Sequence, residues 1–209
     1  MQSTPLLTKQ EMAVWTWLVS KGIANAMHGL SSMIGQELVV TALKVKQYPI
    51  VEAAQLLGGP ENLLVGIYLT IDGDATGHLM LVHDPMMAFQ LIDLQLGSGC
   101  GFNPDVEMGE MEKSVMGEMG NITGSYFLNA LADATDMSLT HSPPAVMIDM
   151  ASAILDVALT PIMMEQDDVL VVQTTFGTTN RQMDGVFLVM PTMDFLRHVL
   201  AKSVGAVNQ

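Results

Sequence analysis

The sequence has few positive charges. Only eight lysines and arginines stand against 22 aspartates and glutamates, which gives a net charge of -14. Nucleic acids and anionic membrane surfaces attract proteins through basic patches, so this composition argues against both as partners. Two interpretations of the acidity stay open: it keeps the chain soluble, or it attracts a basic patch on a protein partner.

Long apolar runs and paired cysteines are also missing. Stretches such as 63–69 and 151–155 are interrupted well before the roughly 18 residues that a membrane-spanning helix needs. The N-terminal segment has no basic start followed by an apolar block, so we expect no secretory signal. The single cysteine, Cys100, excludes an internal disulfide. These absences predict a cytoplasmic protein without membrane insertion.

The motifs of several common chemistries are absent as well. The five histidines show no ligand spacing such as His-x-x-x-His, so we expect no metal site. No glycine-rich turn is followed by the lysine of a phosphate-binding loop. Ser114 and Ser125 lie in no sequence that is typical of a nucleophile elbow. The sequence therefore predicts no cofactor of its own.

What the sequence does contain is one order of elements written twice. Residues of about 8–97 predict a helix (8–33), a strand (37–44), a short helix (49–57), a hairpin (63–71 and 77–82) and a helix (86–96). Residues of about 104–203 repeat this order with a helix (107–135), a strand (136–140), a helix (147–158), two strands (169–176 and 185–189) and a helix (193–202). A turn-rich linker, 97–104, separates the repeats.

This repetition predicts the fold. We expect an α/β (α+β) fold in which residues 1–209 form a single pseudo-two-fold domain, with the two repeats building a continuous mixed sheet flanked by helices. Helices on both faces would bury the apolar strands from both sides. Two separate modules, one for each repeat, are the alternative.

The second long helix carries an unusual set of residues. Glu118 and Asn121 lie three positions apart, which on a helix places their Cβ atoms about 5–6 Å from each other on one face. Glycines at 117, 120 and 124 surround them, although each glycine costs a helix roughly 1 kcal/mol relative to alanine. Such glycines predict close approach of another backbone. The alternative for the polar pair is an ordinary solvated helix face.

With Glu-x-x-Asn-Ile-x-x-Gly on a long helix within this repeated order, the chain resembles the CheC/CheX/FliY family of chemotaxis phosphatases and looks most like its CheC branch. Ala130, Leu131, the Pro143-Pro144 pair and the run 148–150 add to the match. The resemblance covers nearly the whole chain.

The resemblance implies an enzyme, a hydrolase of signal transduction. Proteins of this family hydrolyse the aspartyl phosphate of the response regulator CheY, so CheY dephosphorylation is the expected activity. Carried over to this sequence, Glu118 docks on the regulator and Asn121 orients the attacking water. The magnesium ion would belong to the phosphorylated regulator.

The resemblance also implies a second partner, CheD. By position, CheD binding would involve a helix at Ile148–Val157, with Asp149, Ala153 and Asp156 as contact residues. The alternative is that this apolar helix belongs to the core.

The first repeat departs from the family motif. An offset of 101 residues aligns the two long helices and places Trp17 and Ser20 where the second repeat has Glu118 and Asn121. We therefore expect the first repeat to be catalytically inactive. Trp15 and Trp17 either pack between helices or mark a binding surface. Loss of one motif keeps a second class of function open, a non-enzymatic adaptor that binds CheD or CheY as a FliM-like scaffold.

Overall fold

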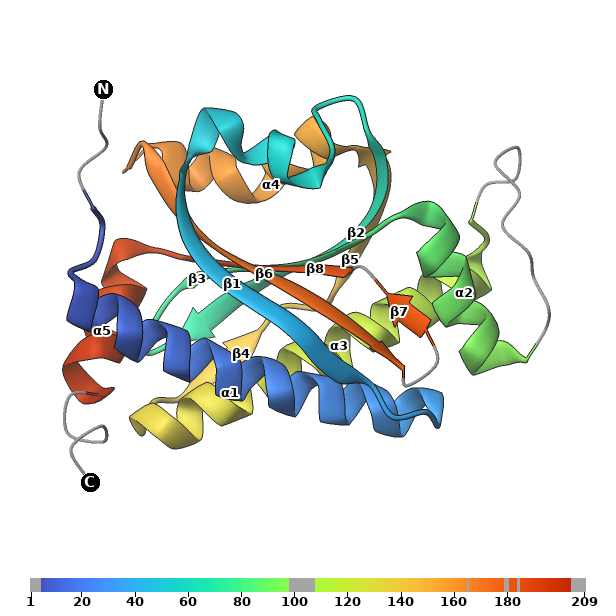
Figure 1. The fold of residues 1–209 in the computed structure, drawn as a ribbon, viewed down its shortest axis with the longest axis horizontal. Coiled ribbons are helices and arrows are strands. Elements are labelled where there is room, and N and C mark those ends of the chain that lie inside the picture. The colour runs from blue at the N-terminus through green and yellow to red at the C-terminus, as the bar shows by residue number, and fades with distance from the viewer. Residues whose placement is uncertain (1–4, 98–107, 165, 179–180, 184, 204–209) are drawn as a thin grey trace.

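The structure, a computed structural model, describes residues 5–97, 108–164, 166–178, 181–183 and 185–203 (Figure 1). Its helices are α1 (Lys9–Ile34), the 3-10 helix η1 (Ile50–Leu57), α2 (Pro85–Leu96), α3 (Glu110–Thr135), α4 (Ala151–Met163) and α5 (Met193–Ser203). Its strands are β1 (Val39–Pro49), β2 (Leu63–Gly73), β3 (Gly77–His83), β4 (Leu139–His141), β5 (Ala145–Met150), β6 (Asp168–Thr178), β7 (Arg181–Met183) and β8 (Gly185–Pro191).

The strands form a layer between two layers of helices. One sheet has the order β1-β6-β7, and the other has the order β4-β2-β3-β8, with β5 also paired to β2. The two sheets adjoin where β6 contacts β8. Figure 1 shows α1 and α3 on one side of this layer and η1 and α4 on the other.

The predicted fold class is confirmed, because helices flank a sheet that is buried on both faces. One apolar cluster lies between the sheet and α1, α2, α3 and α5, and a second lies between the sheet and α4 with η1. Within that class, the strand pairs registered in the described residues are antiparallel rather than mixed. Short hairpins such as that between β2 and β3 allow only antiparallel neighbours.

The sequence marks where α1 and α2 begin. Thr8 caps α1 in a capping box, in which its side chain accepts from the Glu11 amide and the Glu11 carboxylate accepts from the Thr8 amide. Hydrogen bonds from Thr8 hold the pKa of Glu11 below its usual value. Asp84 caps α2 by accepting from the Met86 amide at 2.8 Å. The predicted start of this helix after Asp84 is confirmed.

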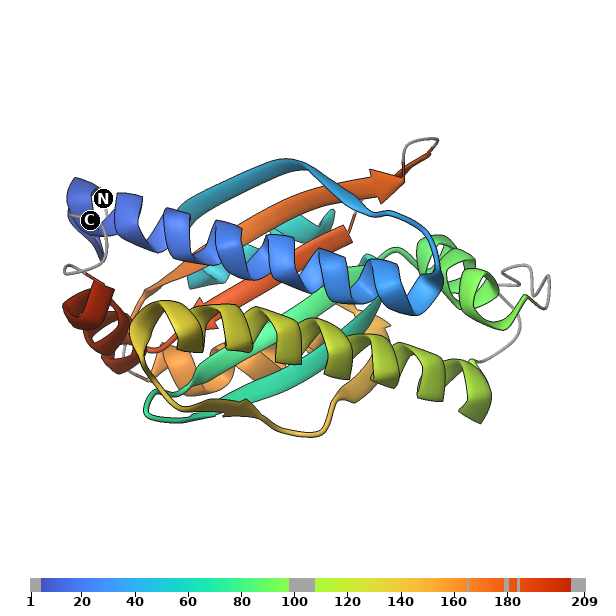
Figure 2. The same cartoon turned by 90° about the horizontal axis from the view of Figure 1, so that it is seen from below.

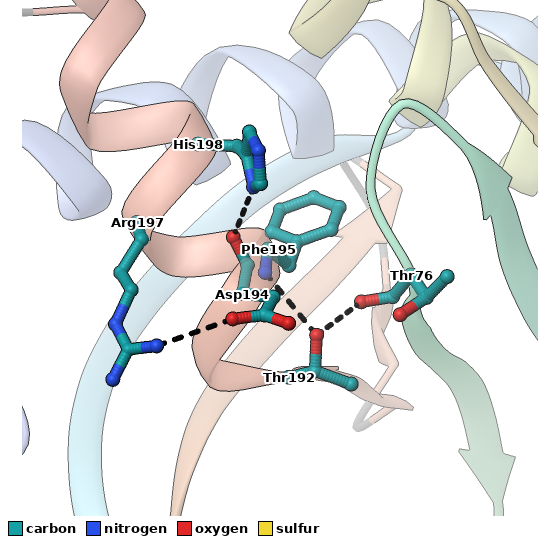
Figure 3. Close-up of polar contacts among 6 residues, drawn as sticks. All are labelled: Thr76, Thr192, Asp194, Phe195, Arg197 and His198. Atoms are coloured by element: carbon teal, nitrogen blue, oxygen red, sulfur yellow. Dashed lines mark hydrogen bonds and ion pairs between the residues drawn. The ribbon is translucent and has the colours of Figure 1, made fainter.

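The start of α5 ties the two halves of the chain together (Figure 3). The Thr192 hydroxyl donates to the Thr76 carbonyl at 2.8 Å and accepts from the Phe195 amide at 3.2 Å. The Phe195 ring meets Trp15 edge to face, with 5.9 Å between centroids. Trp15 is completely buried, so the packing alternative holds for this tryptophan.

One expectation about the elements is wrong, one strand was not expected, and one expectation falls outside the described residues. The helix predicted at 147–158 is wrong in its first turn, because residues 145–150 form β5 and α4 begins at Ala151. Pairing with β2 over residues 63–68 fixes that apolar segment as a strand. The short strand β7 was not predicted. The linker lies outside the described residues except for Gly97.

Candidate functional site

The helix α3 is held against α1 by small residues of α1. A side chain at Gly22 would collide with the Phe127 ring, and one at Gly29 would collide with the Tyr126 ring. The Asn25 side chain donates to the Tyr126 carbonyl at 2.7 Å. Figure 2 shows the two helices running side by side along the sheet. One face of α3 is therefore fixed by α1, and another faces the sheet.

Glu118 and Asn121 lie on the remaining, outer face of α3. Both residues are exposed, and neither side chain makes a hydrogen bond or ion pair with the part of the chain that the structure describes. The neighbouring Met116 and Met119 are completely buried and anchor the same two turns in the core. A carboxylate and a carboxamide therefore project together from a rigid helix, and their polar atoms are available to a partner.

The glycines around this pair bring α3 close to the sheet. A Cβ atom at Gly120 would collide with Ile67 of β2 and lie 3.3 Å from Pro144. At Gly124 it would lie 3.3 Å from both Leu69 and the His141 ring. Close packing occurs at these two positions, but the predicted backbone approach is wrong, because the nearest atoms belong to side chains. The prediction is also wrong for Gly117, where the nearest atom lies 4.0 Å away.

A hydrogen-bonded pair beside the motif was missed from the sequence. The Ser125 hydroxyl lies 2.8 Å from Nε2 of His141, and Nδ1 of the same ring lies 2.8 Å from the Ser142 carbonyl. Ser125 is one helical turn beyond Asn121. Its separation of 16 residues from His141 left no local pattern to detect, and the packing of α3 against β4 brings the two together.

The aligned positions of α1 look different. The Ser20 hydroxyl donates to the Trp17 carbonyl of its own helix at 2.8 Å. Trp17 is half-buried, lies under the Lys21 ammonium at 4.0 Å from the ring centroid, and lines a groove of about 980 Å³ between α1 and α5. Neither residue presents the carboxylate or carboxamide of the motif. Catalytic inactivity of this repeat stays a prediction.

The three residues expected to contact CheD do not lie on one helix. Asp149 is exposed at the end of β5, where its carboxylate accepts from the Met150 amide at 2.7 Å. Ala153 is half-buried and Asp156 is exposed, both on α4. They are close in sequence across the strand-to-helix junction, so they belong to one region of the surface. Their role as a contact stays a prediction.

Two general features of the described residues bear on what the site can hold. No three of their histidine, cysteine, aspartate and glutamate side chains gather as ligands for a metal ion. Across the same residues, no helix combines the length and the apolar character needed to cross a membrane.

The comparison with known protein families matches the segment of chain that contains the candidate site. Residues 111–148, which hold α3 and the Pro143-Pro144 turn, match the CheC-like family. The chain is 25% identical over 183 residues to the CheY-P phosphatase CheC of Bacillus subtilis (strain 168), with 85% of each protein covered.

Solved structures show the same fold over nearly the whole chain. The crystal structure of Thermotoga maritima FliY matches with a TM-score of 0.77 and 20% identity, covering 96% of this chain and 99% of that one. A chain of the crystal structure of the FliG-FliM complex from H. pylori matches with a TM-score of 0.63 and 12% identity, covering 94% of this chain and 100% of that one. The fold is thus the one seen in the FliY structure and in the FliG-FliM complex. The resemblance to the CheC/CheX/FliY family predicted from the sequence is confirmed.

Proposed function

We propose that this chain is a CheC-type chemotaxis phosphatase that hydrolyses the aspartyl phosphate of phosphorylated CheY. One observation carries the proposal: Glu118 and Asn121 project, exposed, from one face of α3, and neither side chain has a hydrogen-bond or ion-pair partner among the residues that the structure describes. The segment that matches the CheC-like family contains both residues. The relative in Bacillus subtilis, named as a CheY-P phosphatase, supports the same activity.

The chemistry asks little of the protein. An acyl phosphate is already activated, so its hydrolysis needs a water molecule held in line with phosphorus and neutralisation of developing charge. The Asn121 carboxamide both donates and accepts hydrogen bonds, which lets it orient that water without acting as a strong base. A hundredfold acceleration corresponds to only about 2.7 kcal/mol.

Glu118 has the complementary role of docking. Its exposed carboxylate pairs with a lysine beside the regulator's phosphorylated aspartate and so aligns α3 with the phosphate. The magnesium ion that offsets the phosphate charge is bound by the regulator. The phosphatase then contributes no metal ligand, and it acts where the regulator acts, in the cytoplasm.

The test is the decay rate of phosphorylated CheY with the intact chain, Glu118→Ala and Asn121→Ala. We expect the intact chain to accelerate decay and each substitution to abolish the acceleration. Glu110 and Asn129 are exposed residues of the same types on the same helix, so Glu110→Ala and Asn129→Ala are matched controls that should keep the activity. No acceleration by the intact chain, with CheD also supplied, would contradict the phosphatase.

The second candidate is a non-enzymatic adaptor that binds CheD or CheY. The fold match to FliM in complex structures and the absence of the motif from α1 favour it. We propose the surface of Asp149, Ala153 and Asp156 as its CheD contact. For an adaptor, Asp149→Lys with Asp156→Lys should weaken CheD binding, and neither the intact chain nor Asn121→Ala should accelerate the decay of phosphorylated CheY.

A further inference from the structure

A hydrogen-bonded chain runs from the sheet to the helix that carries the proposed catalytic pair. The Ser142 amide donates to the Thr70 carbonyl of β2 at 3.0 Å, and the Thr70 amide donates to the Ser142 hydroxyl at 3.1 Å. The preceding residue, His141, forms a hydrogen bond with Ser125 of α3. These contacts connect β2 to the outer turns of α3 through polar atoms alone.

The contacts define how the His141 ring is protonated when neutral. A carbonyl oxygen can only accept, so Nδ1, 2.8 Å from the Ser142 carbonyl, must donate. Nε2 is then the acceptor, and the Ser125 hydroxyl donates to it at 2.8 Å. The ring is therefore held at both nitrogens and cannot turn without losing a hydrogen bond.

The same segment packs on α3 by shape. Pro144 lies over Gly120 and the His141 ring lies over Gly124, in both cases where a larger residue would meet the neighbouring side chain. Met116 and Met119 anchor these turns in the core, but the glycine positions themselves have no side chain to restrain the rotation of the outer face. The Ser125–His141 hydrogen bond supplies that restraint one turn from Asn121.

The first long helix, α1, lacks the glycines and the hydroxyl of this arrangement. At an offset of 101 residues, the bounds of α1 and α3 coincide, and Val19, Ile23 and Ala24 stand where α3 has the two glycines and Ser125. Val19 and Ile23 are completely buried side chains of the core. The restraint therefore occurs only in the repeat that has the exposed carboxylate and carboxamide.

We infer that Ser125 and His141 are positioning residues for the reaction at Asn121. The inference rests on the proposed phosphatase function and adds to it the groups that set the orientation of the carboxamide. Neither side chain touches the phosphate. Their hydrogen bond fixes the turn of α3 that follows Asn121, so the water held by the carboxamide stays in line with phosphorus.

The experiment separates kcat from KM for phosphorylated CheY as substrate. His141→Ala and Ser125→Ala should each lower kcat by on the order of tenfold, since a misplacement of ~1 Å can cost a hundredfold. KM should stay near its original value because Glu118 and the docking face remain. The double variant should be no slower than either single variant, because both remove the same bond.

A conservative replacement distinguishes positioning from loss of fold. In His141→Gln the side-chain oxygen reaches the place of Nε2 and accepts from Ser125, so most of kcat should return. The control is His198→Ala, which removes an exposed histidine on α5 whose Nδ1 also bonds a carbonyl at 2.8 Å. It should leave both kinetic constants unchanged.

Three results would overturn the inference. They are an unchanged kcat in His141→Ala, a raised KM with unchanged kcat, and a His141→Gln variant as slow as His141→Ala. The proposed function would survive each of these results as long as the intact chain is active and Asn121→Ala is inactive. An intact chain that does not accelerate decay would instead overturn the proposed function, and the inference with it.

Discussion

The helices α1 and α3 have the same length and opposite uses of glycine. Each has 26 residues, and each ends at a residue in the left-handed conformation, Gly35 at φ 68° and Asp136 at φ 52°. In α1, Gly22 and Gly29 face the partner helix. In α3, Gly120 and Gly124 face the sheet and the segment that follows Leu139.

This difference explains how one helix can present a polar pair while its counterpart cannot. The seam between the helices is provided by α1, so α3 needs no glycine there. The glycines of α3 instead allow the helix to pack closely on Ile67 and Leu69. They also leave space for Pro144 and His141 beside its outer face. In α1 the aligned positions hold the core side chains of Val19 and Ile23, and the half-buried Trp17 lines the groove beside α5.

A second comparison concerns the last residue of two equivalent strands. Both β3 and β8 have seven residues, and they end at His83 and Pro191. His83 is fully buried and meets Phe176 edge to face at 6.2 Å, and neither of its nitrogens has a hydrogen-bond partner in the described part of the chain. Burial lowers the pKa of His83 to about 4. Pro191 has no ionisable side chain.

The largest expected effect is a loss of stability in acid. The unfolded chain protonates His83 near pH 6.5 and the folded chain only near pH 4, so between these values the unfolded state binds more protons. Stability from this group is complete above about pH 6.5 and falls by about 3 kcal/mol as the pH decreases to about 4.

The measurement is urea unfolding between pH 4 and 7, beside His83→Leu. The leucine removes the titration without breaking a hydrogen bond, so the variant should lose stability less steeply over this range. Acidic groups contribute to the slopes of both proteins, and their difference isolates His83. Parallel slopes would contradict the expectation and show that a proton reaches the folded ring.

The next prediction tests the glycines of α3 by replacing them with the residues that α1 has at the aligned positions. Gly120→Val gives α3 the residue that α1 has at the aligned position, and its side chain would collide with Ile67. We expect the free energy of unfolding to fall by about 2 kcal/mol, the usual cost of overpacking a filled core. Urea denaturation measures it.

The matched control is Gly117→Thr, which likewise introduces the residue that α1 has at the aligned position. No atom lies closer than 4.0 Å to a Cβ atom there, so the change should stay within about 0.5 kcal/mol. Equal effects at the two positions would mean that helix propensity, rather than contact with the sheet, decides both.

Sequence patterns predicted what is local and missed what depends on pairing. Asp84-Pro85 marks the start of α2 by itself, because the cap and the proline act within one turn. The apolar run 145–150 fits a strand or a helix equally well, and its pairing with β2 decides the outcome. Asp149 therefore lies at the end of a strand and not on the helix predicted for it.

The candidate site also has a part that local sequence patterns predict and a part that depends on strand pairing. Glu118 and Asn121 are three residues apart, so helix geometry alone places them on one face. Ser125 and His141 were both noted in the sequence, but no spacing connects a helix to a strand edge. Their hydrogen bond exists because β4 and β5 pair along β2, directly beneath the glycines of α3.

The smallest expected effect is a failed transplant of the motif. In an Asn121→Ala background, Trp17→Glu with Ser20→Asn writes the polar pair into α1 at the same spacing. Val19 and Ile23 would still hold that helix by core packing, and Ala24 offers no hydroxyl for a restraint like that of Ser125. We expect the decay rate of phosphorylated CheY to rise less than about twofold. If the spacing of the two side chains were sufficient, the transplant would instead restore an acceleration of about a hundredfold.

The transplant in the otherwise intact chain is the control, and it should keep full activity and a normal thermal transition. Recovery of activity in the Asn121→Ala background would show that two side chains on any exposed helix face suffice, and that the glycines and the Ser125–His141 bond serve stability alone. Failure of the transplant, together with slow His141→Ala, would locate the requirement in the packing beneath α3. The distinction between the two repeats would then lie in how each helix meets the sheet, as much as in the residues that it exposes.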